Sequence, residues 1–251
     1  MIDVYYPYFQ KEATWEELRY SIRSLEKYLK IEFRLWIVGD LPEWLNLDKI
    51  YFINHKRCEG MPENSVFDAI QKLLLYLNHP NSGEQFIRMY DDIYLLDNID
   101  LLEIGKFKAI YSFDKIPKRF EKWWGQLYRS VDAVRSKGYP GWNTETHFPE
   151  LFDRDKMKWI IENYKALDRR LLTSTLYYNT LFSDQDPVLF KDCRGIQFYN
   201  NRDGEYYTSS TGDLEVKCKG MIYLNHNDAG LNENLKEFLM RRFPEKSRFE
   251  I

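Results

Sequence analysis

The chain has 251 residues, a formal net charge of −3 and 30% charged residues, which is ordinary for a soluble globular protein with a substantial core. This balance gives no general reason to expect nucleic-acid binding, so any phosphate chemistry must be local. Three scattered cysteines without a Cys-x-x-Cys pair argue against a disulfide framework and favour a reducing cytoplasm. Without a signal-like start or an apolar run of about 18 residues, we expect a cytoplasmic protein with no transmembrane segment.

Aromatic residues are frequent and make up 17% of the chain, with 19 Tyr and 7 Trp. Such an excess is typical of sites for flat or ring-shaped ligands, sugars and bases included. The alternative interpretation is an aromatic-rich core.

The first part of the chain alternates between strand-like and helix-like segments. Thr14 and Glu17 have the spacing of a capping box, and apolar residues then recur three and four apart, which predicts a helix over 15–29. A second helix is predicted from Ser65, where a capping residue precedes another apolar stripe. The strands predicted around them cover residues 2–6, ended by Pro7, and residues 33–38, 49–53 and 86–90. This order predicts an α/β fold with a mixed, mainly parallel sheet flanked by helices.

The second part is less regular, and no repeat or linker divides it from the first, so a single domain is expected. Its predicted elements are a strand over 108–113, a helix after Pro117, helices over 155–164 and 169–182, a hairpin around Arg194 and Gly195, a loop over 200–204, a strand over 221–224 and a closing helix over 231–239.

Two adjacent carboxylates, Asp91 and Asp92, directly follow a predicted strand. Neighbouring carboxylates repel each other, and a protein usually tolerates them where a cation lies between; Mg²⁺ and Mn²⁺ choose such oxygen ligands. The alternative is an ordinary acidic turn, since Asp is common in turns. Asp40, Tyr5 and Tyr6 also end predicted strands, and ligands collect at the carboxyl ends of strands in such sheets, so we favour the metal site.

Two basic side chains, Arg19 and Arg23, lie four residues apart and so share a face of the first helix. Like charges at this spacing are unfavourable unless an anion offsets them. One interpretation is a solvated basic face neutralised by Glu16 and Glu26. The other is a phosphate clamp.

The segment 142–149 is a polar loop that holds Trp142, Glu145 and His147 together. Loops carried by a rigid scaffold are where chemistry tends to lie. A lone loop histidine is nonetheless more often a surface or hydrogen-bonding group than a ligand.

These groups together can hold a metal and an anionic ligand. A diphosphate bridged to a divalent cation meets both demands, and the metal also stabilises the charge that develops when a diphosphate leaves. The sequence lacks the glycine fingerprints of P-loop and dinucleotide folds, which counts against kinases and dehydrogenases, and it lacks the Gly-x-Ser-x-Gly elbow of serine hydrolases.

An ordered series of short motifs resembles the core of the Stealth-type sugar-phosphate transferases, which look like members of the wider GT-A class of nucleotide-sugar transferases. The motifs are the segment 17–26, the strand to Val38, the segment 41–45, Asn54-His55, Asn64-Ser65 and Asp91-Asp92-Ile93-Tyr94, and Thr146-His147-Phe148-Pro149 resembles the next block of that family. The likeness spans roughly residues 15–160. The end of the chain, with the segment 223–228, a helix and Arg242-Phe243-Pro244, also resembles small bacterial glycosyltransferases.

Two departures from the family pattern leave open whether a sugar or a sugar phosphate is moved. The family usually places Asn before its acid pair, where this chain has Tyr90. The chain is also short and lacks the flanking regions of the longer sugar-phosphate transferases.

The resemblance implies a GT-A-like domain that transfers a sugar from a nucleotide-diphosphate sugar to a glycan or other hydroxyl acceptor in bacterial polysaccharide biosynthesis. Residues of about 1–115 would form its nucleotide-binding half and those of about 116–251 its acceptor half. Asp91 and Asp92 would hold Mn²⁺ or Mg²⁺ against the diphosphate, with His226 as a third ligand.

The remaining expected site residues surround that metal. Tyr5, Tyr6 and Asp40 would border the nucleotide, and Arg19 or Arg23 would meet its phosphates. The candidates for acid or base work at the acceptor are Glu145 and His147, because they share a loop with Trp142, whose face can stack on a sugar.

Two alternatives stay open at this stage. One is transfer of hexose 1-phosphate by a Stealth-type enzyme, in which attack falls on phosphorus. The other is a non-catalytic glycan-binding domain that uses its aromatic side chains alone. Peripheral association with a membrane is also left open.

Overall fold

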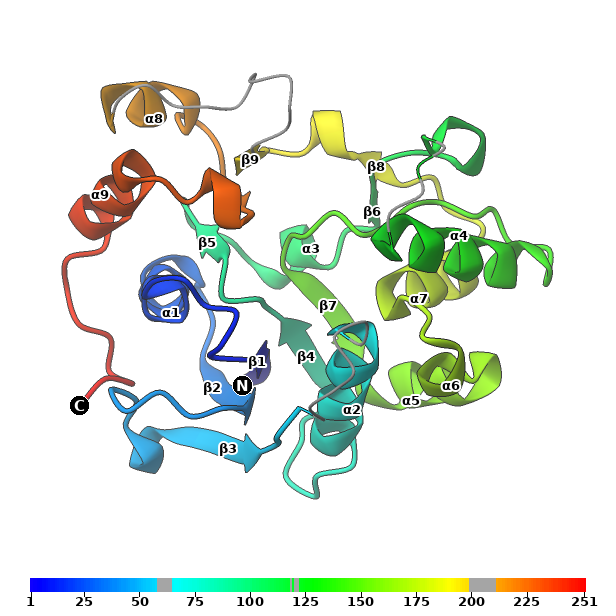
Figure 1. The fold of residues 1–251 in the computed structure, drawn as a ribbon, viewed down its shortest axis with the longest axis horizontal. Coiled ribbons are helices and arrows are strands. Elements are labelled where there is room, and N and C mark those ends of the chain that lie inside the picture. The colour runs from blue at the N-terminus through cyan, green and yellow to red at the C-terminus, as the bar shows by residue number, and fades with distance from the viewer. Residues whose placement is uncertain (58–64, 118, 120–121, 199–210) are drawn as a thin grey trace.

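The computed structural model describes residues 1–57, 65–117, 119, 122–198 and 211–251, and its centre is a five-stranded sheet (Figure 1). The strand order is β3-β2-β1-β4-β7. The strands are β1 (Ile2–Tyr8), β2 (Phe33–Gly39), β3 (Ile50–Asn54), β4 (Gln85–Arg88) and β7 (Glu150–Asp153). The first four are parallel, and β7 is antiparallel to β4. The predicted α/β fold with a mixed, mainly parallel sheet is confirmed.

Helices cover both faces of this sheet. They are α1 (Glu17–Tyr28) on one face and α2 (Ser65–Leu77), α5 (Arg154–Tyr164) and α7 (Thr173–Leu181) on the other. Successive strand residues point to opposite faces, so Val4 and Tyr6 of β1 pack in the core with α1, whereas Tyr5 packs in the core with α2. Since the side chains on both faces of β1 are apolar or aromatic, other elements must shield each face from water.

A second, three-stranded sheet continues from the first through a turn after β4. Its strands are β5 (Ile93–Leu95), β10 (Tyr223–His226) and β9 (Gly195–Phe198), with β10 antiparallel to β5 and parallel to β9. Ile93 and Leu95 face the core under α1, whereas Tyr94 faces a separate core with α8 (Thr211–Lys217) and α9 (Glu233–Arg242). In Figure 1, α8 and α9 lie on the side of the molecule opposite to α4–α7.

The remaining described elements are short or peripheral. They are β6 (Lys108–Ala109), its parallel partner β8 (Val188–Leu189), α3 (Leu101–Ile104), α4 (Lys122–Arg135), α6 (Ala166–Arg169) and 3-10 turns at Leu47–Lys49, Phe113–Lys115, Phe190–Asp192 and Asp228–Gly230. Strands from both parts of the chain share the sheets, because β7 pairs with β4 and β10 pairs with β5. This sharing agrees with the predicted single domain.

The first strand does not end at Pro7, as the sequence predicted, but continues to Tyr8. Met89 donates its backbone N–H to the Tyr5 carbonyl, so the backbone groups of Tyr5 face β4, and those of Pro7, two residues on, face the same side. Pro7 has no N–H to donate, but β4 ends at Arg88, so the sheet loses no hydrogen bond at this position.

The hairpin predicted around Arg194 and Gly195 is wrong. Residues 190–192 form a helical turn, and Gly195 begins β9, which pairs in parallel with β10. The predicted loop at 200–204 lies outside the described residues.

Two other element predictions are corrected. Only Lys108 and Ala109 of the predicted strand 108–113 pair with β8, because Ile110 and Tyr111 exchange hydrogen bonds with the loop residue Asn143. The predicted helix over 169–182 is broken by Arg170, whose φ of 54° is left-handed, so that α7 begins at Thr173. The strands β5 and β7 and the helix α8 were not predicted, because each is too short to show a period.

The capping box predicted at the start of α1 forms only on the Glu17 side, because the N-cap of the helix is Glu16, which makes no side-chain capping bond. The Glu17 carboxylate accepts hydrogen bonds from the backbone N–H and the hydroxyl of Thr14, at 3.0 and 2.9 Å, and from the N–H of Trp15 at 2.8 Å. The helix itself begins at Glu17.

No helix in the described part of the chain is both long and apolar enough to cross a membrane.

The end of β2 depends on a glycine, and this yields a stability prediction. Gly39 has a φ of +132°, and a Cβ atom there would lie 1.9 Å from the backbone oxygen of Tyr8. We expect Gly39→Ala to lower the free energy of unfolding by more than about 2 kcal/mol, measured by urea denaturation. Gly220→Ala is the control, because it has a φ of +78° with no atom within 4 Å. Equal losses in the two variants would contradict a steric cause at Gly39.

Candidate active site

Tyr90, Asp91 and Asp92 form the turn by which the chain leaves the five-stranded sheet and enters the three-stranded one. The Ile93 N–H closes the turn on the Tyr90 carbonyl at 3.2 Å. The carboxylates thus follow the carboxyl end of β4, beside the end of β1. The strand order reverses there, since β2 and β3 lie on one side of β1 and β4 on the other. Ligands of parallel α/β sheets bind at such a point.

Asp92 is held by His147 from the loop before β7. His147 Nε2 lies 2.8 and 2.9 Å from the two carboxylate oxygens, and its ring stacks on Tyr90 with centroids 5.0 Å apart and planes at 8°. His147 has a left-handed φ of 54°, and Asn225 of β10 donates its side-chain N–H to the His147 carbonyl. Contacts from β10 and from the acid turn thus hold His147 in this strained conformation and orient its imidazole on the turn.

The Asp92–His147 contact is an ion pair. Burial opposes ionisation of Asp92, but the imidazole outweighs burial and lowers the pKa of Asp92 below its usual value. Burial also opposes protonation of His147, and Asp92 outweighs it, so the pKa of His147 is raised. Each group thus stabilises the charged form of the other.

Asp91 has no such partner among the described residues. Burial, then repulsion from Asp92 and Glu17, raises the pKa of Asp91 to about 7. A cation beside the turn would remove this cost, because it would favour the ionised form of both carboxylates.

His226, from β10, lies in the same region but is engaged on both ring nitrogens. Nε2 is 3.0 Å from the Tyr94 hydroxyl, and Nδ1 is 3.1 Å from the carbonyl of Asn227. The ring is buried, and burial lowers its pKa, so the imidazole is neutral. A neutral ring has one N–H, which we assign to Nδ1, so that Nε2 accepts from Tyr94. Metal binding by Nε2 would require Tyr94 to give up this bond.

A cavity of about 150 Å³ opens beside Asp91, at the switch point of the sheet. Its wall comes from the end of β1, the acid turn and the first turns of α2, and consists of Pro7, Phe9, Glu12, Arg57, Ser65, Asp68, Ala69, Lys72, Tyr90 and Asp91.

A buried lysine lines this cavity. Lys72 is 2% exposed, and its Nζ lies 2.8 Å from Asp68 and 2.9 Å from the carbonyl oxygen of Tyr8. The Nε2 atom of His55 also lies 3.1 Å from the Oδ1 atom of Asp68. The ammonium group is therefore ion-paired and fixed in place at the carboxyl end of β1.

Two cations of the cavity also flank Phe9. The Arg57 guanidinium lies 4.9 Å and the Lys72 ammonium 5.4 Å from the centre of the Phe9 ring, and Arg57 pairs with Glu12 at 2.5 Å. Two positive groups and the Asp91 carboxylate therefore line the same cavity.

A second polar cluster lies on the other side of Tyr90. Arg88, at the end of β4, pairs with Glu150 of β7 at 2.5 Å and donates to the Thr173 hydroxyl at 2.9 Å. Glu145 accepts two bonds from Thr175, at 3.0 Å from its N–H and 2.7 Å from its hydroxyl. Burial, then repulsion from Glu150, raises the pKa of Glu145.

The structure separates the residues predicted to border the nucleotide. Tyr5 and Tyr6 point to opposite faces of β1, and the Tyr6 hydroxyl bonds Ser21 of α1 at 2.9 Å, away from the cavity wall. Tyr5 lies on the face with α2. Asp40 follows β2, where its carboxylate accepts from the N–H of Gln10 at 2.8 Å.

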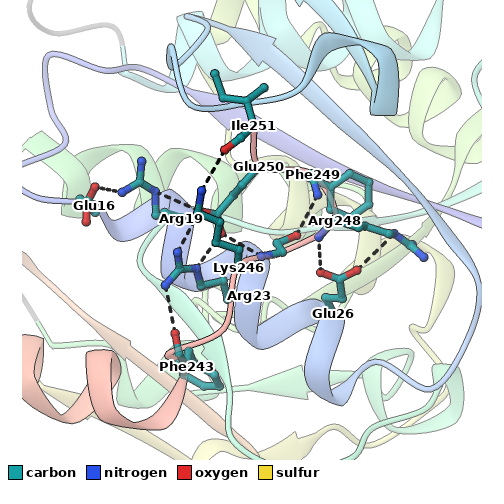
Figure 2. A network of polar contacts seen from close by, with 11 residues as sticks. Glu16, Arg19, Arg23, Glu26, Phe243, Lys246, Arg248, Phe249, Glu250 and Ile251 are labelled. Atoms are coloured by element: carbon teal, nitrogen blue, oxygen red, sulfur yellow. Dashed lines mark hydrogen bonds and ion pairs between the residues drawn. The ribbon is translucent and has the colours of Figure 1, made fainter.

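The two predicted phosphate-binding arginines hold the C-terminal segment instead (Figure 2). Arg23 donates two hydrogen bonds to the Glu250 carboxylate, of 2.6 and 2.8 Å, and one to the carbonyl of Phe243, of 3.1 Å. Arg19 pairs with Glu16 and lies 3.5 Å from Glu250. Within the described residues neither arginine bonds the acid turn. The predicted neutralisation by Glu16 is confirmed, while Glu26 pairs with Arg248.

The loop 142–149 faces both sides of the acid turn. His147 reaches Asp92, and Glu145 lies beside the Arg88 cluster. The backbone of Trp142 is bound by Asn179 through both its N–H and its carbonyl, and its ring packs against the core with α2, so it does not line the cavity beside Asp91.

Sequence reasoning missed Lys72, Asp68 and Arg88 as site residues. Their signal was a charged side chain inside an apolar segment, because Asp68 and Lys72 stand four apart in the buried stripe of α2 and Arg88 ends a buried strand. A charge in such a place needs a buried partner or a ligand.

The donor set suits Mg²⁺ or Mn²⁺ carried in with a phosphate ligand. No three His, Cys, Asp or Glu side chains of the described residues converge closely enough to enclose a metal. Mg²⁺ is usually bound by only one or two protein carboxylates, with phosphate oxygens and water completing the shell. Asp91 and Asp92 are two such carboxylates, although Asp92 is already paired with His147.

Comparison with known proteins was made by sequence and by structure. No family model matches the chain, and no curated protein matches it significantly. Among solved structures, it is similar to galactosyltransferase LgtC in complex with donor and acceptor sugar analogues, with a TM-score of 0.48 and 13% identity over 98% of both chains. It is also similar to an active-site mutant of LgtC, with a TM-score of 0.48 and 12% identity over 98% of both chains.

The raised pKa of Asp91 predicts a pH-dependent stability. Its value of about 7 exceeds the ordinary 3.8, so the folded state loses stability as pH rises from about 4 to 7. Asp91→Asn should therefore raise Tm more at pH 8 than at pH 4.5, by about 2–4 °C for each kcal/mol regained. Calorimetry with EDTA present would measure this.

Asp97→Asn is the control, since Asp97 is exposed and lies outside the turn. It should change Tm equally at both pH values. A lower Tm for Asp91→Asn at pH 8 would contradict the proposed repulsion.

Proposed function

We propose that the protein is a metal-dependent glycosyltransferase of GT-A-like architecture, which moves a sugar from a nucleotide-diphosphate sugar to a glycan or other hydroxyl acceptor. The observation that carries this proposal is the acid turn. Two adjacent carboxylates lie at the switch point of the sheet, and the first of them, Asp91, borders a cavity with a buried, ion-paired lysine. A metal–diphosphate ligand needs this combination of oxygen ligands and a fixed cation.

On the donor side, Asp91 and Asp92 would hold Mn²⁺ or Mg²⁺. The bound metal would supply stabilisation of the charge on the leaving diphosphate. Lys72 and Arg57 would bind phosphate oxygens in the larger cavity. Because Asp68 already fixes Lys72, little side-chain entropy is lost when a phosphate binds.

On the acceptor side, Glu145 is the better candidate for a base. Its raised pKa makes it a stronger proton acceptor than an ordinary carboxylate. His147 instead acts as a positioning residue, because its Nε2 is committed to Asp92. The two halves of the chain divide the work in this proposal: residues of about 1–115 supply the acid turn and Lys72, and residues of about 116–251 supply the loop with Glu145.

Transfer of hexose 1-phosphate is the second candidate, and the motif series of residues 17–94 favours it. It would use the same metal and cations. In sugar transfer the bond from the anomeric carbon to the diphosphate breaks and a nucleoside diphosphate leaves. In sugar-phosphate transfer the acceptor hydroxyl attacks the sugar-bearing phosphorus, the bond from this phosphorus to the bridging oxygen breaks, and a nucleoside monophosphate leaves.

The aromatic excess does not favour a pure glycan-binding domain. The largest fully buried side chains of the described residues are mostly aromatic, and they include Trp36, Tyr76, Tyr94, Phe86 and Phe238. These rings lie in the core, where no sugar can stack on them.

The decisive experiment is a panel of nucleotide sugars with Mn²⁺ or Mg²⁺, scored for donor hydrolysis and for the nucleotide released. We expect release of a nucleoside diphosphate, and we expect Asp91→Asn and Asp92→Asn to lower kcat/KM at least ~100-fold, because each removes a metal ligand. Asp97→Asn should retain full activity.

Three results would count against this function. They are hydrolysis of no donor together with no thermal stabilisation by any nucleotide, full activity in EDTA, and full activity in both turn variants. Release of the monophosphate would replace sugar transfer by sugar-phosphate transfer.

A further inference from the structure

A smaller cavity, of about 60 Å³, lies next to the proposed donor site. It shares Pro7, Ala69 and Tyr90 with the wall of the larger cavity. Its other walls are apolar side chains of α2 and the segment 171–173, together with Tyr5, Arg88 and Glu145. A group that enters it is thus adjacent to the acid turn, to the proposed phosphate cavity and to the candidate base.

Tyr5 lines this cavity and carries an unused hydrogen-bond donor. Its side chain is 0% exposed, and its hydroxyl has no hydrogen-bond partner in the described part of the protein. Burial raises the pKa of Tyr5 well above its usual value, so the hydroxyl keeps its proton. An unsatisfied buried hydroxyl costs about 1–3 kcal/mol, and a ligand that bonds it recovers that cost.

Glu145 supplies the complementary acceptor. Both of its hydrogen bonds to Thr175 use Oε1, and no bond to Oε2 occurs within the described residues. A sugar hydroxyl both donates and accepts, so neighbouring hydroxyls can satisfy Tyr5 and Glu145 together.

The charges around the cavity select against an acidic ligand. The Arg88 guanidinium is already paired with Glu150, and Glu145 adds a second carboxylate. A third carboxylate would meet no free cation in the described wall, and its transfer from water would be costly.

We propose that this cavity receives the hydroxyl-bearing edge of the transferred sugar, that Tyr5 and Glu145 bind it, and that the site prefers neutral hexoses to uronic acids. The inference rests on the proposed glycosyltransferase function and specifies its donor. The nucleoside is placed elsewhere, because Glu145 is on the loop of the acceptor half and must lie near the reacting sugar carbon to act as a base.

Tyr5→Phe tests the proposal, because it removes one unpartnered hydroxyl and leaves the ring packing. We expect an unchanged or higher Tm, an unchanged Kd for UDP with Mn²⁺, and a Kd for UDP-glucose about three- to tenfold weaker, the loss of one neutral hydrogen bond. Isothermal titration calorimetry would measure both ligands, with GDP and GDP-mannose substituted if the donor panel selects guanosine.

Tyr223→Phe is the matched control. Its hydroxyl is also buried without a partner, but Tyr223 lies on β10 outside both cavities. It should change neither Kd. Wild-type protein should also bind UDP-glucuronate more weakly than UDP-glucose.

Three outcomes would overturn the inference while leaving the function intact. If Tyr5→Phe weakens UDP and UDP-glucose equally, the cavity serves the nucleoside. If it weakens neither, Tyr5 does not bind the sugar. If UDP-glucuronate binds as well as UDP-glucose, the cavity does not prefer neutral hexoses. Failure of wild-type protein to bind any nucleotide with Mn²⁺ would instead refute the glycosyltransferase function itself.

Discussion

The contact between Asp92 and His147 is the constraint on which the site depends. Asp92 lies in the turn that follows β4. His147 lies 55 residues later, in a loop that Asn225 of β10 holds through the His147 carbonyl. The pair therefore joins the parallel sheet, the three-stranded sheet and the loop with Glu145 at one point. Because the imidazole neutralises one of two adjacent carboxylates, the turn carries a single uncompensated acid, Asp91.

Two buried cations near that turn have partners within the described residues. Lys72 is paired with Asp68, and Arg88 with Glu150, so both cations are fixed before any ligand arrives. Buried ion pairs contribute little net stability, but they hold charged groups in place at low entropic cost to a ligand. Asp91 differs, because burial and repulsion from Asp92 and Glu17 raise its pKa to about 7.

The arginines of α1 show that a charge pattern can predict the need for an anion without predicting every anion that meets it. Glu16 pairs with Arg19 as predicted, but Glu250 was not predicted. Two like charges four residues apart do need an anion. The structure provides one in Glu250, which comes from the far end of the chain and packs over α1. No local pattern carries that information, because the pairing spans more than 200 residues of sequence.

The sequence by itself determined the mainly parallel α/β layers, the contact between Thr14 and Glu17, and the placement of an acid pair after β4, since each depends on neighbouring residues or on a period. Only the tertiary structure decided that Tyr5 lines a cavity while Tyr6 does not, that His226 is engaged by Tyr94, and that Lys72 enters the site. Those outcomes depend on which face of a strand another element covers and on contacts between distant segments, which a local pattern does not encode.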